Sequence, residues 1–274
     1  MKETIYIITV LLLSNFKWMN GQTTSEQWDT YIASYEDGNP GSTTLRMDLI
    51  NNAPFEHLPY VLVTGITYET TRDDRFPESE TFQILYKIGD ELVELIAKET
   101  ESVLVGSFMY NKERLEYFYI EKDKGLKDRI EKFYTENYPD YKFYLNIKED
   151  KEWSYYREFL YPNEETLNYM ADQSVLRNLQ KEGDPLTKER RVDHWLYFSS
   201  ESDMNKCKNV LKKRNYSIQS SGKNKETSLP FELQIWRIDN VDINSIYPIT
   251  SELREVAKQY NGEYDGWETS VEKE

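Results

Sequence analysis

In the last third of this sequence, apolar residues recur every second residue in some segments and every three to four residues in others. Few folds accommodate the order in which these segments follow one another. Patterns typical of a strand, helix, strand, strand, helix and strand follow one another at residues 192–198, 201–214, 216–220, 231–238, 245–260 and 263–271. The usual solution to this succession is an antiparallel sheet with both helices on one face. In such a sheet the first strand lies beside the last, so residues 192–198 and 263–271 should be neighbours.

The chain before residue 163 shows a different mixture of strands and helices. The predicted elements are a hairpin around the turn residues 37–41, a strand at 58–69, a helix at 77–99 interrupted by Gly89, a hairpin at 102–121, a helix at 125–136 and a strand at 141–149. We therefore predict an α+β protein of two domains, residues 23–162 and 163–274. Each domain is long enough to bury its own core.

The second domain should begin with an amphipathic helix at residues 163–181. Its apolar side chains follow a spacing of three and four residues, at Leu167, Met170, Ala171, Val175 and Leu179. The segment 182–185, which contains glycine and proline, should end it. This helix is therefore expected to contribute an apolar stripe to the core of the second domain.

The first 22 residues are typical of a secretory signal peptide. An apolar run of ten residues, TIYIITVLLL, follows Lys2 and gives way to polar sequence. The run is too short to span a membrane as a helix, so we expect no membrane span. Two alternatives stay open: the run forms a buried strand, or translation starts at Met19 and leaves a cytoplasmic protein. The first interpretation predicts a periplasmic or secreted protein.

The acidic residues are concentrated in the front of the chain. The net charge is −15, and nearly all of it belongs to the first 187 residues. An acidic surface repels phosphate backbones, so we expect no direct binding to nucleic acid. The charge favours a basic protein as partner, whose identity the sequence does not give.

The supply of reactive side chains is small. Cys207 is the only cysteine, which excludes an internal disulfide and every cysteine-based zinc or iron–sulfur site. The only histidines are His57 and His194, and a serine or cysteine hydrolase would need one of them. No glycine-rich phosphate loop precedes a helix. We therefore expect no enzyme, no cofactor and no metal site.

The segment EYDGWETS, residues 263–270, places two large rings among three carboxylates. A bulge at Asp265 and Gly266 would point Tyr264 and Trp267 to one face of the strand and most of the acids to the other. We predict structural roles for Trp195, Tyr264, Gly266 and Trp267. The candidate partner-binding residues are Asp193, His194, Glu263, Asp265 and Glu268. An alternative is that His194 and neighbouring acids move a proton or bind a metal.

Two stretches of the second half, GDPLTKERRVDHWLYF and TSELREVAKQYNGEYDGWETSV, carry a family resemblance. This half resembles the ribonuclease E inhibitor family, regulator of ribonuclease activity B (RraB). The front half, with PGSTTLRMDL, VLVGSFMYNKERLEYFYI and EWSYYREFLYP, is similar to the domain of unknown function 695 (DUF695). The resemblance implies a ferredoxin-like second domain and a protein-binding regulator that is not an enzyme. It also implies a ribonuclease as partner if the protein is cytoplasmic.

Overall fold

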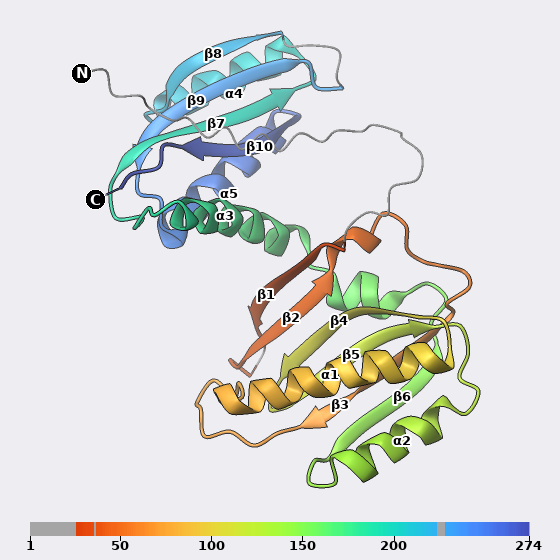
Figure 1. Ribbon diagram of the computed structural model, residues 1–274. Coiled ribbons are helices and arrows are strands. Elements are labelled where there is room, and N and C mark those ends of the chain that lie inside the picture. The colour runs from red at the N-terminus through yellow and green to blue at the C-terminus, as the bar shows by residue number, and fades with distance from the viewer. Residues whose placement is uncertain (1–25, 36, 224–227, 274) are drawn as a thin grey trace. The chain divides into compact units, whose positions relative to one another are not determined.

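The computed structural model describes residues 26–273 except residue 36 and residues 224–227 (Figure 1). The predicted signal peptide and its alternatives lie outside the described residues. The described chain forms two compact units, one ending at Asn163 and the other beginning at Glu164. Each unit has its own sheet and helices, which confirms the prediction of a two-domain α+β protein. None of the helices among these residues combines the length and apolar character needed to cross a membrane.

The front unit is built on a six-stranded antiparallel sheet of order β1-β2-β4-β5-β3-β6 (Figure 1). Its strands are β1 (Trp28–Ser34), β2 (Pro40–Arg46), β3 (Tyr60–Thr67), β4 (Ser102–Tyr110), β5 (Glu113–Ile120) and β6 (Phe143–Glu149). Its helices are α1 (Ser79–Glu99) and α2 (Leu126–Asn137), with short turns of other helix types at η1 (Met47–Leu49) and η2 (Tyr155–Leu160). The predicted hairpins are therefore β1–β2 and β4–β5, joined through the β2–β4 pair.

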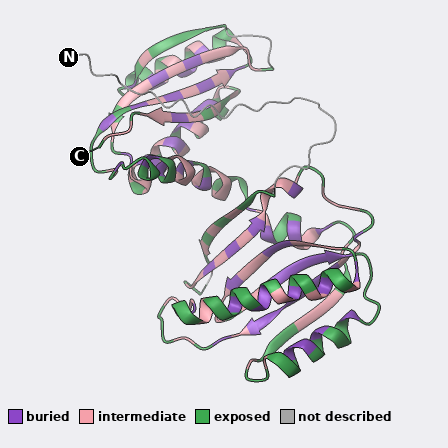
Figure 2. Cartoon of the chain, in the orientation of Figure 1, coloured by how far each residue is buried: buried purple, intermediate pink, exposed green. Residues whose placement is uncertain are grey.

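Both faces of the front sheet are buried. One face packs under α1 and α2, whose outer sides are exposed and whose inner sides are buried (Figure 2). The other face packs under η1, η2 and the loop that holds Trp153. The Trp153 ring is fully buried, stacks on Tyr119 at 3.9 Å between ring centroids, and donates its indole N–H to the Leu58 carbonyl at 3.1 Å. Tyr156 and Leu160 of η2 are fully buried in the same cluster, so this segment is also part of the core.

Gly89 has a structural reason for its place inside α1. A Cβ at this position would lie 3.2 Å from Oε1 of Glu116, a buried carboxylate on β5. Glu116 accepts a hydrogen bond from Nε of Arg114 at 2.7 Å, and the two form a buried ion pair. Glycine lowers intrinsic helix stability, but here it lets α1 approach the sheet over that pair.

The C-terminal unit has the predicted strand–helix order. It comprises α3 (Glu164–Lys181), β7 (Arg190–Phe198), α4 (Glu201–Lys213), β8 (Ser217–Lys223), β9 (Phe231–Asp239), α5 (Ile243–Gln259) and β10 (Gly262–Thr269). The sheet order is β10-β7-β9-β8, with all neighbours antiparallel, so the first strand lies beside the last as expected. The helices pack on one face of the sheet (Figure 1), which is the ferredoxin-like arrangement.

Local hydrogen bonds fix where the last two helices begin. The Ser200 side chain accepts a hydrogen bond from the Asp203 backbone N–H at 3.1 Å and so caps α4. The Asp242 carboxylate accepts bonds from the N–H groups of Asn244 and Ser245 and so caps α5. Such caps satisfy backbone donors that the first helical turn leaves without a partner.

Candidate partner-binding site

The bulge predicted in β10 is present. Tyr264 lies opposite Leu196 and Gly266 lies opposite Trp195, so Asp265 is an extra residue in the pairing with β7. Gly266 has a φ of +148°, which side-chain-bearing residues rarely adopt. After the bulge Trp267 lies opposite His194, and both rings of the segment therefore face the helices. The prediction that one extra residue aligns the two rings is confirmed.

The acids of the segment face the other side of the sheet. Glu263 lies opposite Tyr197 and Glu268 lies opposite Asp193, two residues of β7 that alternate with its buried positions. Asp265, at the bulge, is exposed. We call Asp193, Glu263, Asp265 and Glu268 the acidic rim. The structure thus places four of the predicted partner-binding residues along one face of the β7–β10 pair.

The members of the acidic rim differ in their electrostatic surroundings. Asp193 accepts two hydrogen bonds from Arg191, both at 2.6 Å, and the Arg191 guanidinium also lies 4.6 Å from the centre of the Trp236 ring. Partial burial raises the pKa of Glu268, and the Asp193 charge adds to that rise while Arg191 opposes it. Burial also raises the pKa of Asp265. A nearby cation would therefore stabilise the charged forms of Asp265 and Glu268.

His194 does not belong to this surface. Its side chain is 0% exposed and lies on the helix face of the sheet, opposite to the acids. Its Nδ1 forms a hydrogen bond with the Tyr264 hydroxyl at 2.9 Å, and its Nε2 has no partner among the residues that the structure describes. The grouping of His194 with the acids is therefore corrected, because the alternation of β7 separates residue 194 from residue 193.

Replacing His194 with glutamine should flatten the loss of stability at acid pH. Burial lowers the pKa of His194 from 6.5 to about 3, and the charge of Arg237 contributes less. Between these values the unfolded chain binds a proton that the folded chain does not, so stability falls as pH decreases through this window. The expected loss from this group is about 2 kcal/mol at a pH of about 5, relative to neutral pH.

Urea unfolding at several pH values would measure this effect. His57→Gln is the matched control, because it removes the other histidine of the chain from an exposed loop and leaves the buried His194 in place. Equal slopes in the wild type and His194→Gln would show that His194 is not the buried neutral group described here.

A buried carboxylate on α3 organises the helix side of the site. Asp172 is 2% exposed and accepts hydrogen bonds from the Trp267 indole N–H at 3.0 Å and from the Thr250 hydroxyl. The Arg254 guanidinium lies 3.5 Å from Asp172 and donates to Thr250 Oγ1 at 2.9 Å. Burial raises the pKa of Asp172, against the Thr250 hydrogen bond and the Arg254 charge. This cluster links α3, α5 and β10.

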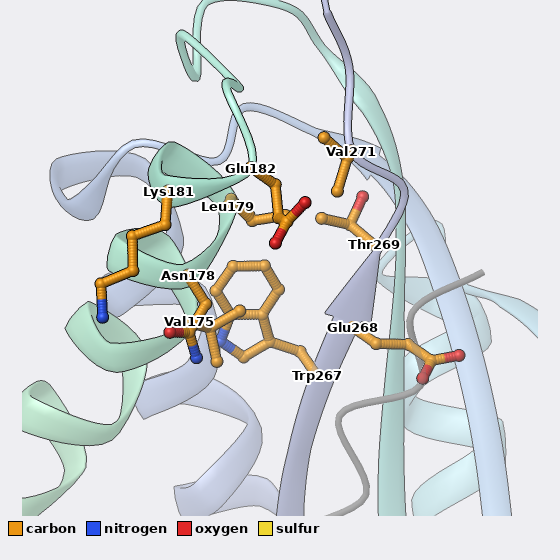
Figure 3. Close-up of a pocket in the computed structure, with 9 residues that line it drawn as sticks. All are labelled: Val175, Asn178, Leu179, Lys181, Glu182, Trp267, Glu268, Thr269 and Val271. Atoms are coloured by element: carbon orange, nitrogen blue, oxygen red, sulfur yellow. The ribbon is translucent and has the colours of Figure 1, made fainter. Parts of the chain in front are cut away.

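A pocket of about 220 Å³ opens between α3 and the end of β10 (Figure 3). The Trp267 ring forms its floor, Val175 and Leu179 of α3 line one side, and Val271 lines the other. The Glu182 carboxylate points toward the edge of the Trp267 ring, while the Lys181 and Glu268 side chains point away from the ring (Figure 3). The pocket is therefore mainly apolar with one inward-facing negative charge.

An ion pair holds the wall that contains Val271. The carboxylate of Asp184, in the loop after α3, pairs with the Arg190 guanidinium, and both side chains are buried. Asp184 also accepts the Glu272 backbone N–H at 2.9 Å, and Arg190 donates to the Ser270 carbonyl at 3.0 Å. These contacts fix the residues on either side of Val271, so the pocket wall is anchored to both α3 and β7.

Comparison with known proteins gives each unit a family. Residues 26–161 match a family of unknown function, DUF695, and residues 170–269 match regulator of ribonuclease activity B. We call these two matched units the DUF695 domain and the RraB domain. These matches confirm the resemblance of both halves. A search of curated proteins finds no match. A crystal structure of an unknown protein from Galdieria sulphuraria matches at 10% identity over 78% of this chain and 99% of that one, but its TM-score of 0.20 supports no structural argument.

Several features of the RraB domain were missed from the sequence. Asp172 stands four residues before Leu176 and seven before Leu179, and all three are buried. The spacing of Asp172 from these leucines was the signal that could have shown its burial. The predicted apolar stripe instead contained its neighbour Ala171, which is exposed. Trp195 lies on the same side of the sheet as the acidic rim, whereas Tyr264 and Trp267 lie on the other side.

No cluster of three or more potential metal ligands occurs within the described parts of the chain.

Proposed function

We propose that this protein is a non-enzymatic regulator whose RraB domain binds a basic partner protein through the acidic rim. The observation that carries the proposal is the match of residues 170–269 to regulator of ribonuclease activity B, which supports a binding or regulatory role. The rim offers a suitable surface. Among the described residues, Glu263, Asp265 and Glu268 form no ion pair, and burial already disfavours the charges of two of them. A cationic partner surface would offset that cost.

Cross-linking from a native extract tests this function. The wild-type chain should capture a specific protein, and a rim variant carrying Glu263→Gln, Asp265→Asn and Glu268→Gln should capture much less of it. The control carries Glu189→Gln, Glu201→Gln and Glu255→Gln, which remove three exposed charges elsewhere in the domain. Capture of no specific protein, or equal capture by both variants, would count against the proposal.

We also propose that the protein is exported and acts on an envelope or secreted partner. The apolar run at residues 4–13 behind Lys2 supports this proposal. The intact mass of the native chain, measured in separated cytoplasmic and envelope fractions, distinguishes the alternatives. An envelope chain without roughly its first 20 residues would support export. A cytoplasmic chain that begins at Met19 would contradict it.

Inhibition of a ribonuclease is the second candidate function, and the family description of residues 170–269 favours it. It requires a cytoplasmic chain, in which the RraB domain would bind ribonuclease E or a similar endoribonuclease and slow RNA cleavage. Purified protein in large excess should then lower the cleavage rate of the nuclease. An unchanged rate would eliminate this candidate and leave the exported regulator as the remaining proposal.

A further inference from the structure

We propose that the pocket beside Trp267 binds an arginine side chain of the partner protein. The inference rests on the proposed function and deepens it, because it names one contact that the partner makes. The pocket volume of about 220 Å³ has room for one long side chain. Nothing in the family matches assigns a role to the pocket.

The floor of the pocket presents the face of an indole ring. Trp267 is 7% exposed, and its only polar atom is committed to Asp172 through the hydrogen bond of 3.0 Å. The ring is therefore held in one orientation by a buried group. The face of a tryptophan ring is the best aromatic surface for a cation, because its quadrupole is negative above the ring.

The charge around the opening is negative. The Glu182 side chain points toward the edge of the Trp267 ring (Figure 3). Glu182 forms no ion pair among the residues that the structure describes. It lies directly after α3, whose C-terminal end carries the negative pole of the helix dipole. Lys181 is the basic residue among those that line the pocket, and its side chain extends away from the opening (Figure 3). The other polar lining residues are Asn178, Glu268 and Thr269.

Arginine matches these features better than other side chains. Its aliphatic stem would contact Val175, Leu179 and Val271, and its planar guanidinium would stack on Trp267 while pairing with Glu182. The guanidinium is less strongly hydrated than a lysine ammonium, so it loses less on entering a half-closed site. An apolar side chain would fill the walls but leave Glu182 without a counter-charge.

The test uses butylguanidinium as a probe of the arginine side chain and butylurea as its neutral analogue. The full chain is labelled with 5-fluorotryptophan, and the fluorine NMR signal of Trp267 is assigned by its loss in Trp267→Phe.

Butylguanidinium should shift the Trp267 signal in a saturable way, in the millimolar range. Butylurea should bind several-fold more weakly. Glu182→Gln should weaken butylguanidinium binding about threefold, since a partly exposed ion pair contributes only modestly to binding. Glu189→Gln, an exposed acid outside the pocket, should not weaken it.

Two results would overturn the inference. Equal binding of butylurea and butylguanidinium would show a pocket for apolar side chains, and no response of Trp267 to either probe would show a pocket that takes no side chain. Because both results come from the isolated chain, they are distinct from failure of the proposed function, which is measured by partner capture. Loss of capture in the rim variant together with an unresponsive Trp267 would leave the proposed function in place and remove only this contact.

Discussion

Replacing Asp172 with alanine should lower the free energy of unfolding of the RraB domain by about 3 kcal/mol. The substitution leaves the Trp267 N–H, the Thr250 hydroxyl and the Arg254 guanidinium without their shared acceptor. A buried donor that loses its partner costs more than the hydrogen bond contributes, because water does not replace the lost acceptor. Chemical denaturation followed by tryptophan fluorescence measures the change.

Gln180→Ala is the matched control for this variant. Gln180 lies on the exposed side of the same helix, so its truncation should change stability by no more than about 0.5 kcal/mol. The fluorine signal of Trp267 should also move in Asp172→Ala, since the indole loses the bond that orients it. A variant as stable as the wild type would mean that the Asp172 cluster is not a structural centre.

Replacing Trp153 with alanine should destabilise the DUF695 domain by about 4 kcal/mol, which is typical of truncating a fully buried tryptophan. The ring stacks on Tyr119 at 3.9 Å between centroids and meets the edges of Phe55 and Tyr156 at 5.1 and 6.0 Å. Its loss would leave a cavity between the sheet and η2 and would free the Leu58 carbonyl.

The same measurement on Trp28→Ala provides the comparison. Trp28 is 40% exposed on the edge strand β1, so its truncation should cost less than about 1 kcal/mol. If both tryptophan variants lost equal stability, Trp153 would not be a central part of the core of the front domain.

The arrangement of strands and helices could be predicted wherever a sequence pattern is compatible with only one structure. The strand–helix order after residue 190 led to the observed sheet with β10 beside β7. A single extra residue at Asp265 was enough to predict that Tyr264 and Trp267 share a face. The first inference depends on the order of strands and helices along the chain. The second depends on the period of two along a strand.

The buried polar groups were harder to predict, because they depend on contacts between distant segments. Asp172 is stabilised in the core by residues 78 and 95 positions later in the chain, Thr250 and Trp267. In the sequence, Gly89 indicates only a weak point in α1. The structure explains this glycine by the close approach of Glu116. His194 was grouped with Asp193 because they are adjacent in sequence, although adjacency in a strand places two side chains on opposite faces. Composition and periodicity carry no information about such partners.

The central claim, a basic partner bound at the acidic rim, is tested most directly by the affinity of the captured partner for three purified forms of the chain. We predict that the rim variant Glu263→Gln, Asp265→Asn and Glu268→Gln binds about tenfold more weakly than the wild type, since three ion pairs of about 0.5 kcal/mol each would be lost. The control variant Glu189→Gln, Glu201→Gln and Glu255→Gln should bind nearly as the wild type does. Equal affinities of the rim and control variants would contradict the claim.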